Sequence, residues 1–168
     1  MLMDVSASAL LWYGPRVLMM KRSMSRRIAP GLWAGVGGHL EPLELNDPTA
    51  ACLREIHEET GISAHQIDRF QLRYIIHSQR GKLIYLQYYF AGWLLAEPHL
   101  GETEEGVLHL VEAEHLVGLE TVPSVKELLK HYTEEGVSNS RIYLGSGLWR
   151  DGVREIEWVP LDDWDREA

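Results

Sequence analysis

Three glutamates that lie close together in the chain are the residues best suited to chemistry. Glu55, Glu58 and Glu59 stand three and four positions apart, so on a helix their carboxylates share one side. Like charges at this spacing destabilise a helix by about 0.2–0.5 kcal/mol per pair. A divalent cation would offset that repulsion, because Mg²⁺ takes carboxylate oxygens together with substrate phosphates. The spacing therefore indicates either a metal site on one helical turn or a solvated acidic face.

The helix that would carry these glutamates has clear ends. Asp47 is a good N-cap, and Pro48 suits the first helical position, where its missing N–H costs nothing. Gly61 is the expected left-handed stop. The side away from the glutamates follows the spacing of a buried stripe, and its members are Thr49, Cys52, Leu53, Ile56 and Thr60. We therefore predict a helix over about 48–60 with one buried side and one acidic side.

The residues around the glutamates resemble the signature of the Nudix hydrolase family. That signature runs Gly, five residues, Glu, seven residues, Arg-Glu, an apolar residue, any residue, Glu-Glu, any residue, Gly and an apolar residue. Gly38 and Glu44 match its first half. The run from Arg54 to Ile62 matches its second half without a gap.

The chain departs from this signature in the length of one loop. Nine residues, 45–53, separate Glu44 from Arg54 where the family pattern has seven. We place the two extra residues in the loop 45–47, because Pro48 marks the start of the helix. Such an insertion leaves the helical carboxylates untouched and bears only on the pairing of Glu44 with Arg54 that the resemblance implies.

The resemblance implies a fold, a reaction and a cofactor. The implied fold is α+β, a Nudix-type α/β/α sandwich with a mixed central sheet. The implied reaction is hydrolysis of a phosphoanhydride in a nucleoside diphosphate derivative. The implied cofactor is Mg²⁺, with Mn²⁺ as a substitute, which neutralises phosphate oxygens and lowers the pKa of a bound water. The implied metal ligands are a backbone carbonyl of the glycine pair and three carboxylates: Gly37 or Gly38, Glu55, Glu58 and Glu59.

Catalytic roles follow from the same resemblance. Arg54 would hold the carboxylate array in orientation through Glu44. Glu55, or a glutamate from the acidic loop 96–106, would take the proton from the attacking water. Within that loop we prefer Glu105 and then Glu102.

Residues outside the signature are candidates for binding the substrate. Trp33 stands just before the glycine-rich run. In Nudix enzymes that act on oxidised purine nucleotides, a tryptophan at this place lines the substrate pocket. The alternative for Trp33 is packing in the core. Arg22 opens a basic loop, from which it or Arg26 would reach phosphate or base oxygens, unless the loop is simply solvated. The ring of Tyr85 would pack against the base of the nucleotide. It shares its strand with two other tyrosines, and these three cannot all face one side because strand side chains alternate.

The rest of the chain reads as strands and one more helix. Residues 5–22 have the pattern of a hairpin. In the second helix, Ser124 and Glu127 form a capping box. The segment at about 138–160 reads as a further hairpin with its turn near 150–152, and similar hairpins end some Nudix enzymes for oxidised purine triphosphates. Extra sheet, a contact in a homodimer and a lid over the pocket are three alternatives for it.

Composition narrows the class of protein. The 168 residues are enough for one domain with a core, and we expect a single Nudix domain over 1–168. No apolar run approaches the roughly 20 residues of a membrane span. A net charge of −9 argues against binding DNA or RNA polymers. The single cysteine, and a start without a basic n-region, favour the reducing cytoplasm.

Two substrate classes and one non-enzymatic role stay open. Trp33 and the last hairpin favour a (d)NTP or an oxidised purine triphosphate such as 8-oxo-dGTP, cleaved to a monophosphate and pyrophosphate. The acidic loop 96–106 leaves open ADP-ribose or another nucleoside diphosphate sugar. A non-catalytic nucleotide-sensing module is the third alternative, and the intact glutamates argue against it. In each case the partner is a small-molecule nucleotide.

Overall fold

A computed structural model of the chain describes residues 2–150 and 153–161. Its strands are β1 (Leu2–Tyr13), β2 (Arg16–Arg22), β3 (Trp33–Ala34), β4 (Val36–His39), β5 (Ile67–Arg80), β6 (Leu83–Leu94), β7 (Gly106–Glu112), β8 (Ile142–Arg150) and β9 (Val153–Leu161). Its α-helices are α1 (Pro48–Thr60) and α2 (Pro123–Glu134). Short 3₁₀ turns lie at Pro42–Glu44, Ala64–Gln66, Ala113–Gly118 and Gly136–Ser138. Within the described ranges no helix has the length and apolarity needed to cross a membrane.

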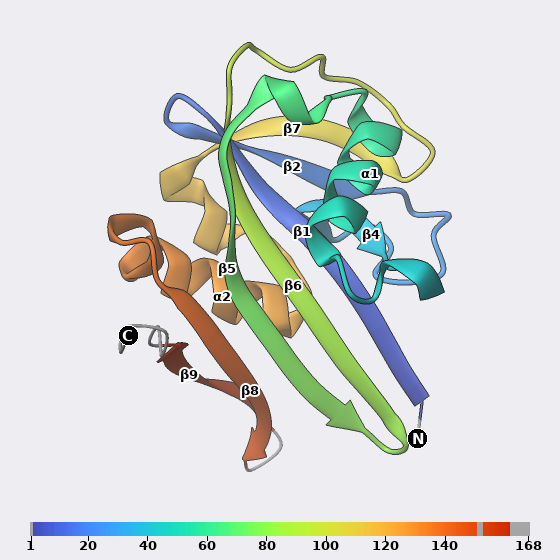
Figure 1. Cartoon of the computed structure of the whole chain (residues 1–168), viewed down its shortest axis with the longest axis vertical. Coiled ribbons are helices and arrows are strands. Elements are labelled where there is room, and N and C mark those ends of the chain that lie inside the picture. Colours follow the sequence, from blue (N-terminus) through green and yellow to red (C-terminus); the bar gives the residue numbers. More distant parts are fainter. Residues whose placement is uncertain (1, 151–152, 162–168) are drawn as a thin grey trace.

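A mixed sheet organises the described chain (Figure 1). Its strand order is β3-β2-β1-β6-β5-β8-β9, with β4 paired to β1 and β7 paired to β2. The β1–β6 and β5–β8 pairs are parallel and the other pairs are antiparallel. One edge of β1 changes partner along its length, from β4 beside residues 6–9 to β2 beside residues 11–13. The predicted α+β fold with a mixed sheet is confirmed.

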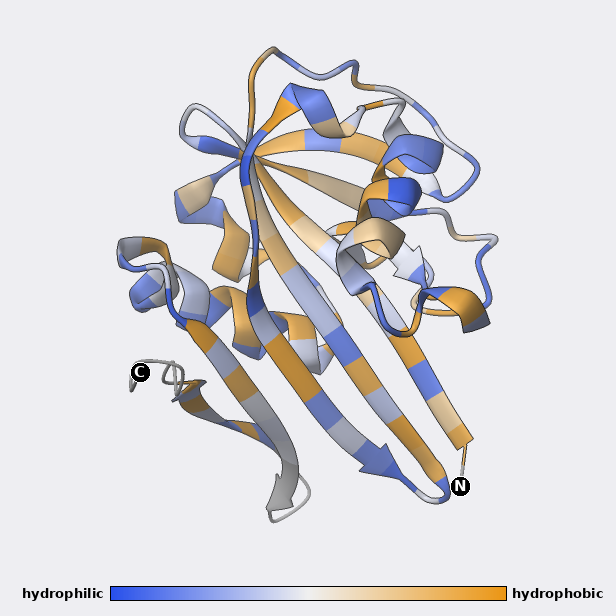
Figure 2. Cartoon of the chain, viewed as in Figure 1, coloured by the Kyte–Doolittle hydropathy of each residue, from blue (hydrophilic) through white to orange (hydrophobic). Residues whose placement is uncertain are grey.

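The two helices cover opposite faces of this sheet, because side chains along β1 alternate between them (Figure 1). Ala9 and Leu11 are buried in a cluster with Cys52 of α1. Leu10 and Trp12 are buried in a second cluster with the core residues of α2. Figure 2 shows apolar and polar bands along the strands of the sheet.

Helix α1 begins and ends where the sequence predicted. The side chain of Asp47 accepts a hydrogen bond from the backbone N–H of Ala50 at 3.0 Å, which satisfies one of the free donors of the first turn. Gly61 closes the helix with φ of 74°, a left-handed conformation that glycine adopts at little cost.

The predicted start of α2 was wrong by two residues. Val122 is the N-cap, Pro123 is the first helical residue, and no side chain caps the helix. The reason is that proline fits the first helical position well, which moves the cap to the residue before it. Ser124 thus lies inside the first turn, buried, and its hydroxyl has no hydrogen-bond partner among the described residues.

The C-terminal hairpin predicted at about 138–160 is present as β8 and β9. It extends the sheet, because β8 pairs in parallel with β5 from Tyr74 opposite Tyr143 onward. Two side chains of β9, Ile156 and Trp158, pack against the core beneath α2. Part of the turn predicted near 150–152 lies outside the described residues. Extra sheet is thus one role of the hairpin, while a homodimer contact and a lid stay predictions.

Gly145 provides a test of this packing. A Cβ at Gly145 would lie 2.6 Å from the ring of Trp158 and 2.8 Å from a methyl of Ile156. We expect Gly145→Ala to lower the free energy of unfolding by about 1–3 kcal/mol, the usual cost of overpacking. Urea unfolding measures it. A Cβ at Gly118 meets nothing within 4 Å, so Gly118→Ala should change stability by less than about 0.5 kcal/mol. Equal stability of the two variants would contradict the packing described.

Candidate active site

Two glutamates of α1 lie against the backbone of β4. A Cβ on Gly38 would come within 2.5 Å of the Glu55 carboxyl carbon, so the missing side chain leaves room for that carboxylate. The N–H of Gly37 donates to Oε2 of Glu59 at 3.0 Å. Gly37 has φ of 148°, which side chains rarely tolerate. The glycine pair therefore lets backbone and carboxylates meet closely at the junction of β4 and α1.

Arg54 connects the signature carboxylates. Its Nε and Nη2 donate to the two oxygens of Glu44 at 2.7 and 2.8 Å. Its Nη1 donates to Glu55 at 2.9 Å and to Glu58 at 3.0 Å. The bonds from Arg54, and then the one from the backbone N–H of Glu41, lower the pKa of Glu44 to about 2. The pairing of Glu44 with Arg54 is thus formed in spite of the longer loop.

The third signature glutamate lies apart from the other two. Glu58 turns to Arg54, and its side chain is 57% exposed, against 18% for Glu55. Among the described residues, no three His, Cys, Asp or Glu side chains converge closely enough to hold one metal ion. Metal ligation by Glu58 stays a prediction, and it would require the carboxylate to leave Arg54.

Two arginines of the basic loop hold Glu105. Nη2 of Arg26 lies 2.6 Å from Oε1 of Glu105, and Nη2 of Arg22 lies 3.6 Å from Oε2. The backbone N–H of Ser23 also donates to the carbonyl of Glu105 at 2.9 Å. The basic loop is therefore tied to the acidic loop, and Glu105, but not Glu102, stands at the site.

A cavity of about 710 Å³, which we call the main cavity, joins these elements. It lies where β1, β4, α1 and the two tied loops meet. The predicted site residues that line it are Arg22, Trp33, Gly38, Glu55, Tyr85 and Glu105, with Glu59 beside them. The predicted residues outside its lining are Arg26, Glu44, Arg54, Glu58 and Glu102. The fold thus brings the metal, phosphate and base candidates to one place.

Aromatic side chains wall the main cavity. The ring of Trp33 contacts that of His109 with centroids 5.1 Å apart, and the Lys21 ammonium lies 5.7 Å from it. The ring is half-buried, so it packs on the core and also faces the cavity. Tyr85 lines the cavity, whereas Tyr88 packs on the α1 side of the sheet. The strand therefore alternates as predicted.

Other lining residues were missed from the sequence. Asp4, Ser6 and Ser8 of β1 and Gln87 of β6 line the main cavity, as does Ser124 at the start of α2. A signal for the first three was present. They are polar residues at alternate positions of a strand that is apolar further on, and such alternation marks a face that leaves the core.

Crowding of carboxylates changes the titration of Glu59. The pKa of Glu59 is raised to about 7. Burial is the largest cause and the charges of Glu55 and Glu105 add to it, while the hydrogen bond from Gly37 opposes the change. A negative charge on Glu59 is therefore costly without a nearby cation.

The donor set fits a hard divalent cation. Glu55 and Glu59 present carboxylate oxygens beside the backbone of Gly38, and Glu105 adds a third carboxylate to the same cavity. Mg²⁺ commonly takes one or two carboxylates and completes its shell with waters and substrate phosphates. A cation would also relieve the repulsion that raises the pKa of Glu59. Glu55, Glu59 and a carbonyl of the glycine pair are the groups that would hold it.

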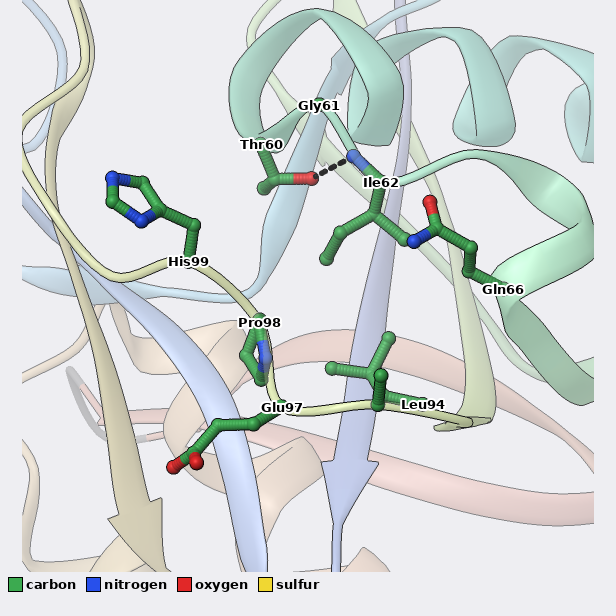
Figure 3. Close-up of a pocket in the computed structure, with 9 residues that line it drawn as sticks. Thr60, Gly61, Ile62, Gln66, Leu94, Glu97, Pro98 and His99 are labelled. Atoms are coloured by element: carbon green, nitrogen blue, oxygen red, sulfur yellow. Dashed lines mark hydrogen bonds between the residues drawn. The ribbon is translucent and has the colours of Figure 1, made fainter.

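A second, smaller cavity lies at the C-terminal end of α1 (Figure 3). Its volume is about 140 Å³, and Thr60, Gln66, Pro98 and His99 are among its lining residues. The hydroxyl of Thr60 is already used, since it accepts a hydrogen bond from the N–H of Ile62 at 3.1 Å. None of the signature carboxylates lines this hollow, so it is separate from the candidate active site.

The chain belongs to the Nudix family. Residues 3–138 match the NUDIX domain, a range that contains the glycine pair, α1 and both loops of the site. The chain is therefore a Nudix hydrolase, a class of pyrophosphohydrolases that typically use a divalent metal. No curated protein matches the chain.

Solved structures share the fold at low sequence identity. The mutator MutT protein from Bacillus halodurans has a TM-score of 0.68 at 19% identity, over 94% of this chain and 97% of its own. The MutT protein from Methanosarcina mazei has a TM-score of 0.65 at 23% identity, over 80% and 96%. The ORF135 protein from E. coli has a TM-score of 0.62 at 21% identity, over 83% of this chain and 95% of its own. The first of these likenesses extends beyond residue 138 and so includes part of the C-terminal strands.

The titration of Glu59 predicts how stability depends on pH without metal. Its pKa in the folded protein is about 7, above the ordinary 4.5, so it stabilises the fold below pH 4.5 and this contribution is lost as the pH rises through 7. One pKa unit is about 1.4 kcal/mol, so the loss is about 3 kcal/mol at most. We expect Glu59→Gln, which stays neutral, to gain stability relative to wild type between pH 4.5 and 8.

Chemical unfolding in EDTA across this pH range measures the difference. Glu97→Gln is the control, because the Glu97 side chain is 60% exposed and lies outside the main cavity. Parallel pH curves for wild type and Glu59→Gln would contradict the described crowding of carboxylates.

Proposed function

We propose that this Nudix hydrolase converts nucleoside triphosphates to monophosphates and pyrophosphate with Mg²⁺ or Mn²⁺. Oxidised purine triphosphates such as 8-oxo-dGTP are the first candidates. The observation that carries the proposal is the main cavity, where Glu55, Glu59 and Glu105 face Arg22 and the ring of Trp33. Three carboxylates suit a cation, a guanidinium suits phosphate oxygens, and an aromatic ring suits a base.

In this proposal each lining residue has one task. Arg22 lines the main cavity, and its guanidinium would donate to phosphate oxygens. Trp33 packs on the base and excludes water from it. Arg54 lies outside the cavity and keeps Glu55 in place through its 2.9 Å bond. A bound Mg²⁺ would neutralise phosphate oxygens and make a bound water more acidic.

Glu105 and Glu55 are the two candidates for taking the proton from the attacking water. Both line the main cavity, and both are bonded to arginines. A carboxylate oxygen has the lone pairs needed to take a proton. Glu105 is our first choice, because Glu55 is also a candidate metal ligand. The water oxygen bonds to one phosphorus, the bridging oxygen leaves with the other phosphate, and the water protons pass to the products or to solvent.

The partner in this proposal is a small nucleotide, and the site of action is the cytoplasm. The net charge of −9 disfavours nucleic acid polymers. The single cysteine, Cys52, is buried and unpaired, which suits a reducing compartment.

A phosphate-release assay tests the proposed reaction. Purified protein with Mg²⁺ or Mn²⁺ is given natural and oxidised triphosphates, and pyrophosphate is detected through a coupled pyrophosphatase. We expect pyrophosphate release from at least one triphosphate. Glu55→Gln should lower kcat by at least about 100-fold, because it removes a candidate ligand and base. Exposed Glu97→Gln, outside the cavity, should leave kcat unchanged. No release from any triphosphate would refute the triphosphate assignment.

Glu58→Gln tests whether the third signature glutamate binds metal. If its carboxylate moves from Arg54 to a cation, the variant should lose kcat by at least about 100-fold and require more Mg²⁺ for half-maximal rate. Without metal, its stability should change by less than about 1 kcal/mol, since the Glu58–Arg54 pair is exposed. Normal turnover would show that Glu58 only pairs with Arg54.

A further inference from the structure

The short turn before β7 holds the backbone of Glu105 in a fixed place. The hydroxyl oxygen of Thr103 accepts hydrogen bonds from the N–H groups of Glu105 and Gly106 at 3.1 and 3.2 Å. The N–H of Thr103 donates to the carbonyl of Gly106 at 2.7 Å. A hydroxyl that binds backbone donors of its own turn stabilises that turn. The backbone that carries Glu105 is therefore closed on itself by local contacts.

Strand β2 and the residue after it hold this turn from the other side. Gly106 lies opposite Arg22 in the β2–β7 pair, and a Cβ on Gly106 would collide with the carbonyl oxygen of Lys21. The N–H of Ser23 donates to the carbonyl of Glu105 at 2.9 Å, so the basic loop and the acidic loop lie side by side (Figure 1). These contacts fix the backbone of Glu105 but leave its side chain free to change rotamer.

Arg26 supplies the contact that holds the carboxylate itself. Its Nη2 lies 2.6 Å from Oε1 of Glu105, and charge-assisted bonds of this kind are the stronger ones among side chains. The N–H of Arg26 donates to the carbonyl of Ser23 at 3.1 Å, so a four-residue turn carries Arg26 back toward the start of β7. The local structure of the basic loop therefore places the guanidinium on Glu105.

The two arginines that pair with Glu105 have different surroundings. Arg22 lines the main cavity, lies 3.6 Å from Oε2 of Glu105, and donates through Nε to the carbonyl of Ile28 at 3.1 Å. Arg26 was a candidate for binding phosphate oxygens, but it lies outside the lining of the cavity and pairs with Oε1. A carboxylate has about four lone-pair sites, so Glu105 held in this way can still accept a proton.

We propose that Arg26 is a positioning residue for Glu105. It holds the carboxylate where Glu105 takes the proton of the attacking water, and it does not itself bind the substrate. The water proton passes to Glu105 and then to solvent, the water oxygen bonds to one phosphorus, and the bridging oxygen leaves with the other phosphate. Arg26 keeps its own protons throughout. This inference rests on the proposed function, in which Glu105 is the first choice for accepting that proton.

Loss of Arg26 should lower kcat and leave KM nearly unchanged. A catalytic group displaced by about 1 Å can cost about 100-fold in rate, so we expect Arg26→Ala to lower kcat by about tenfold or more. Arg26→Lys should recover part of this loss, because an ammonium can also donate to Oε1. A phosphate-binding role would instead raise KM. Steady-state rates with Mg²⁺ on the best nucleotide substrate measure both constants.

A double-mutant cycle shows whether Arg26 acts through Glu105. Glu105→Gln keeps the shape of the side chain but removes the base, and it should lower kcat by about 100-fold. In that background Arg26→Ala should change kcat by less than about twofold, because residues that act as a unit are not additive. Thr103→Val removes the hydroxyl that holds the turn and gives a second, independent cycle in case Arg26→Ala does not fold.

Arg27→Ala is the matched control. Arg27 is the next residue of the same loop, it is exposed, and it lies outside the lining of the main cavity. Its side chain has no hydrogen bond or ion pair among the described residues. The control variant should keep the wild-type kcat and KM. Thermal unfolding of every variant verifies that each is folded at the temperature of the assay.

The outcomes separate this inference from the proposed function. An unchanged kcat or a raised KM in Arg26→Ala, or an equal loss of kcat with Glu105 and with Glu105→Gln, would overturn the inference. Normal turnover by Glu105→Gln would also overturn it and leave triphosphate hydrolysis standing. If the wild-type protein hydrolyses only nucleotides other than triphosphates, the proposed function is refuted and the cycle, measured on those nucleotides, still decides the inference. No hydrolysis of any nucleotide would refute both.

Discussion

Repulsion between carboxylates that share one cavity is the physical constraint on which the site depends. Glu55, Glu59 and Glu105 line the same cavity, and burial, together with the charges of the other two, raises the pKa of Glu59 to about 7. The protein holds them with fixed donors. Arg54 bonds to Glu55, the N–H of Gly37 bonds to Glu59, and two arginines of the basic loop pair with Glu105. A nearby cation would lower the cost of a negative charge on Glu59.

The sheet explains how these donors and carboxylates come together. Because β1 exchanges β4 for β2 along one edge, the backbone of the glycine pair lies beside the middle of the central strand. Helix α1 packs on the same region through Cys52 and Ile56, which turns Glu55 and Glu59 toward β4. The two loops that carry Arg22 and Glu105 meet because β2 and β7 pair, with Arg22 opposite Gly106.

One cavity with two different ends follows from this arrangement. Trp33 and the first turn of α2 make one end, and polar residues of β1 and β6 make the other. The same strands supply core at Leu10 and Trp12 and supply the lining of the cavity at Asp4 and Ser6. On this one face of β1, the residues beneath α2 are buried core residues and the earlier residues line the cavity. Strand residues as well as loop residues therefore line the main cavity.

Features that depend on neighbouring residues could be predicted from the order of the amino acids. The caps and bounds of α1 follow from Asp47, Pro48 and Gly61, and the pairing of Arg54 with Glu44 was predicted from the signature and is confirmed. The caps join residues close along the chain, so local spacing is enough to predict them, whereas the pairing of Arg54 with Glu44 was implied by the family resemblance. The hydrogen bond between Arg54 and Glu58 was not predicted, because it depends on which acceptors lie within reach of the guanidinium.

Contacts between residues far apart in the chain could not be predicted in this way. Asp4 lines the cavity beside Tyr85 of β6, some eighty residues later in the chain. The ion pairs that hold Glu105 to Arg22 and Arg26 of the basic loop were not predicted. Ser124 lines the cavity instead of capping α2, since Pro123 occupies the first helical position. Strand pairing and loop contacts arise from the packing of the whole chain, which no local spacing encodes.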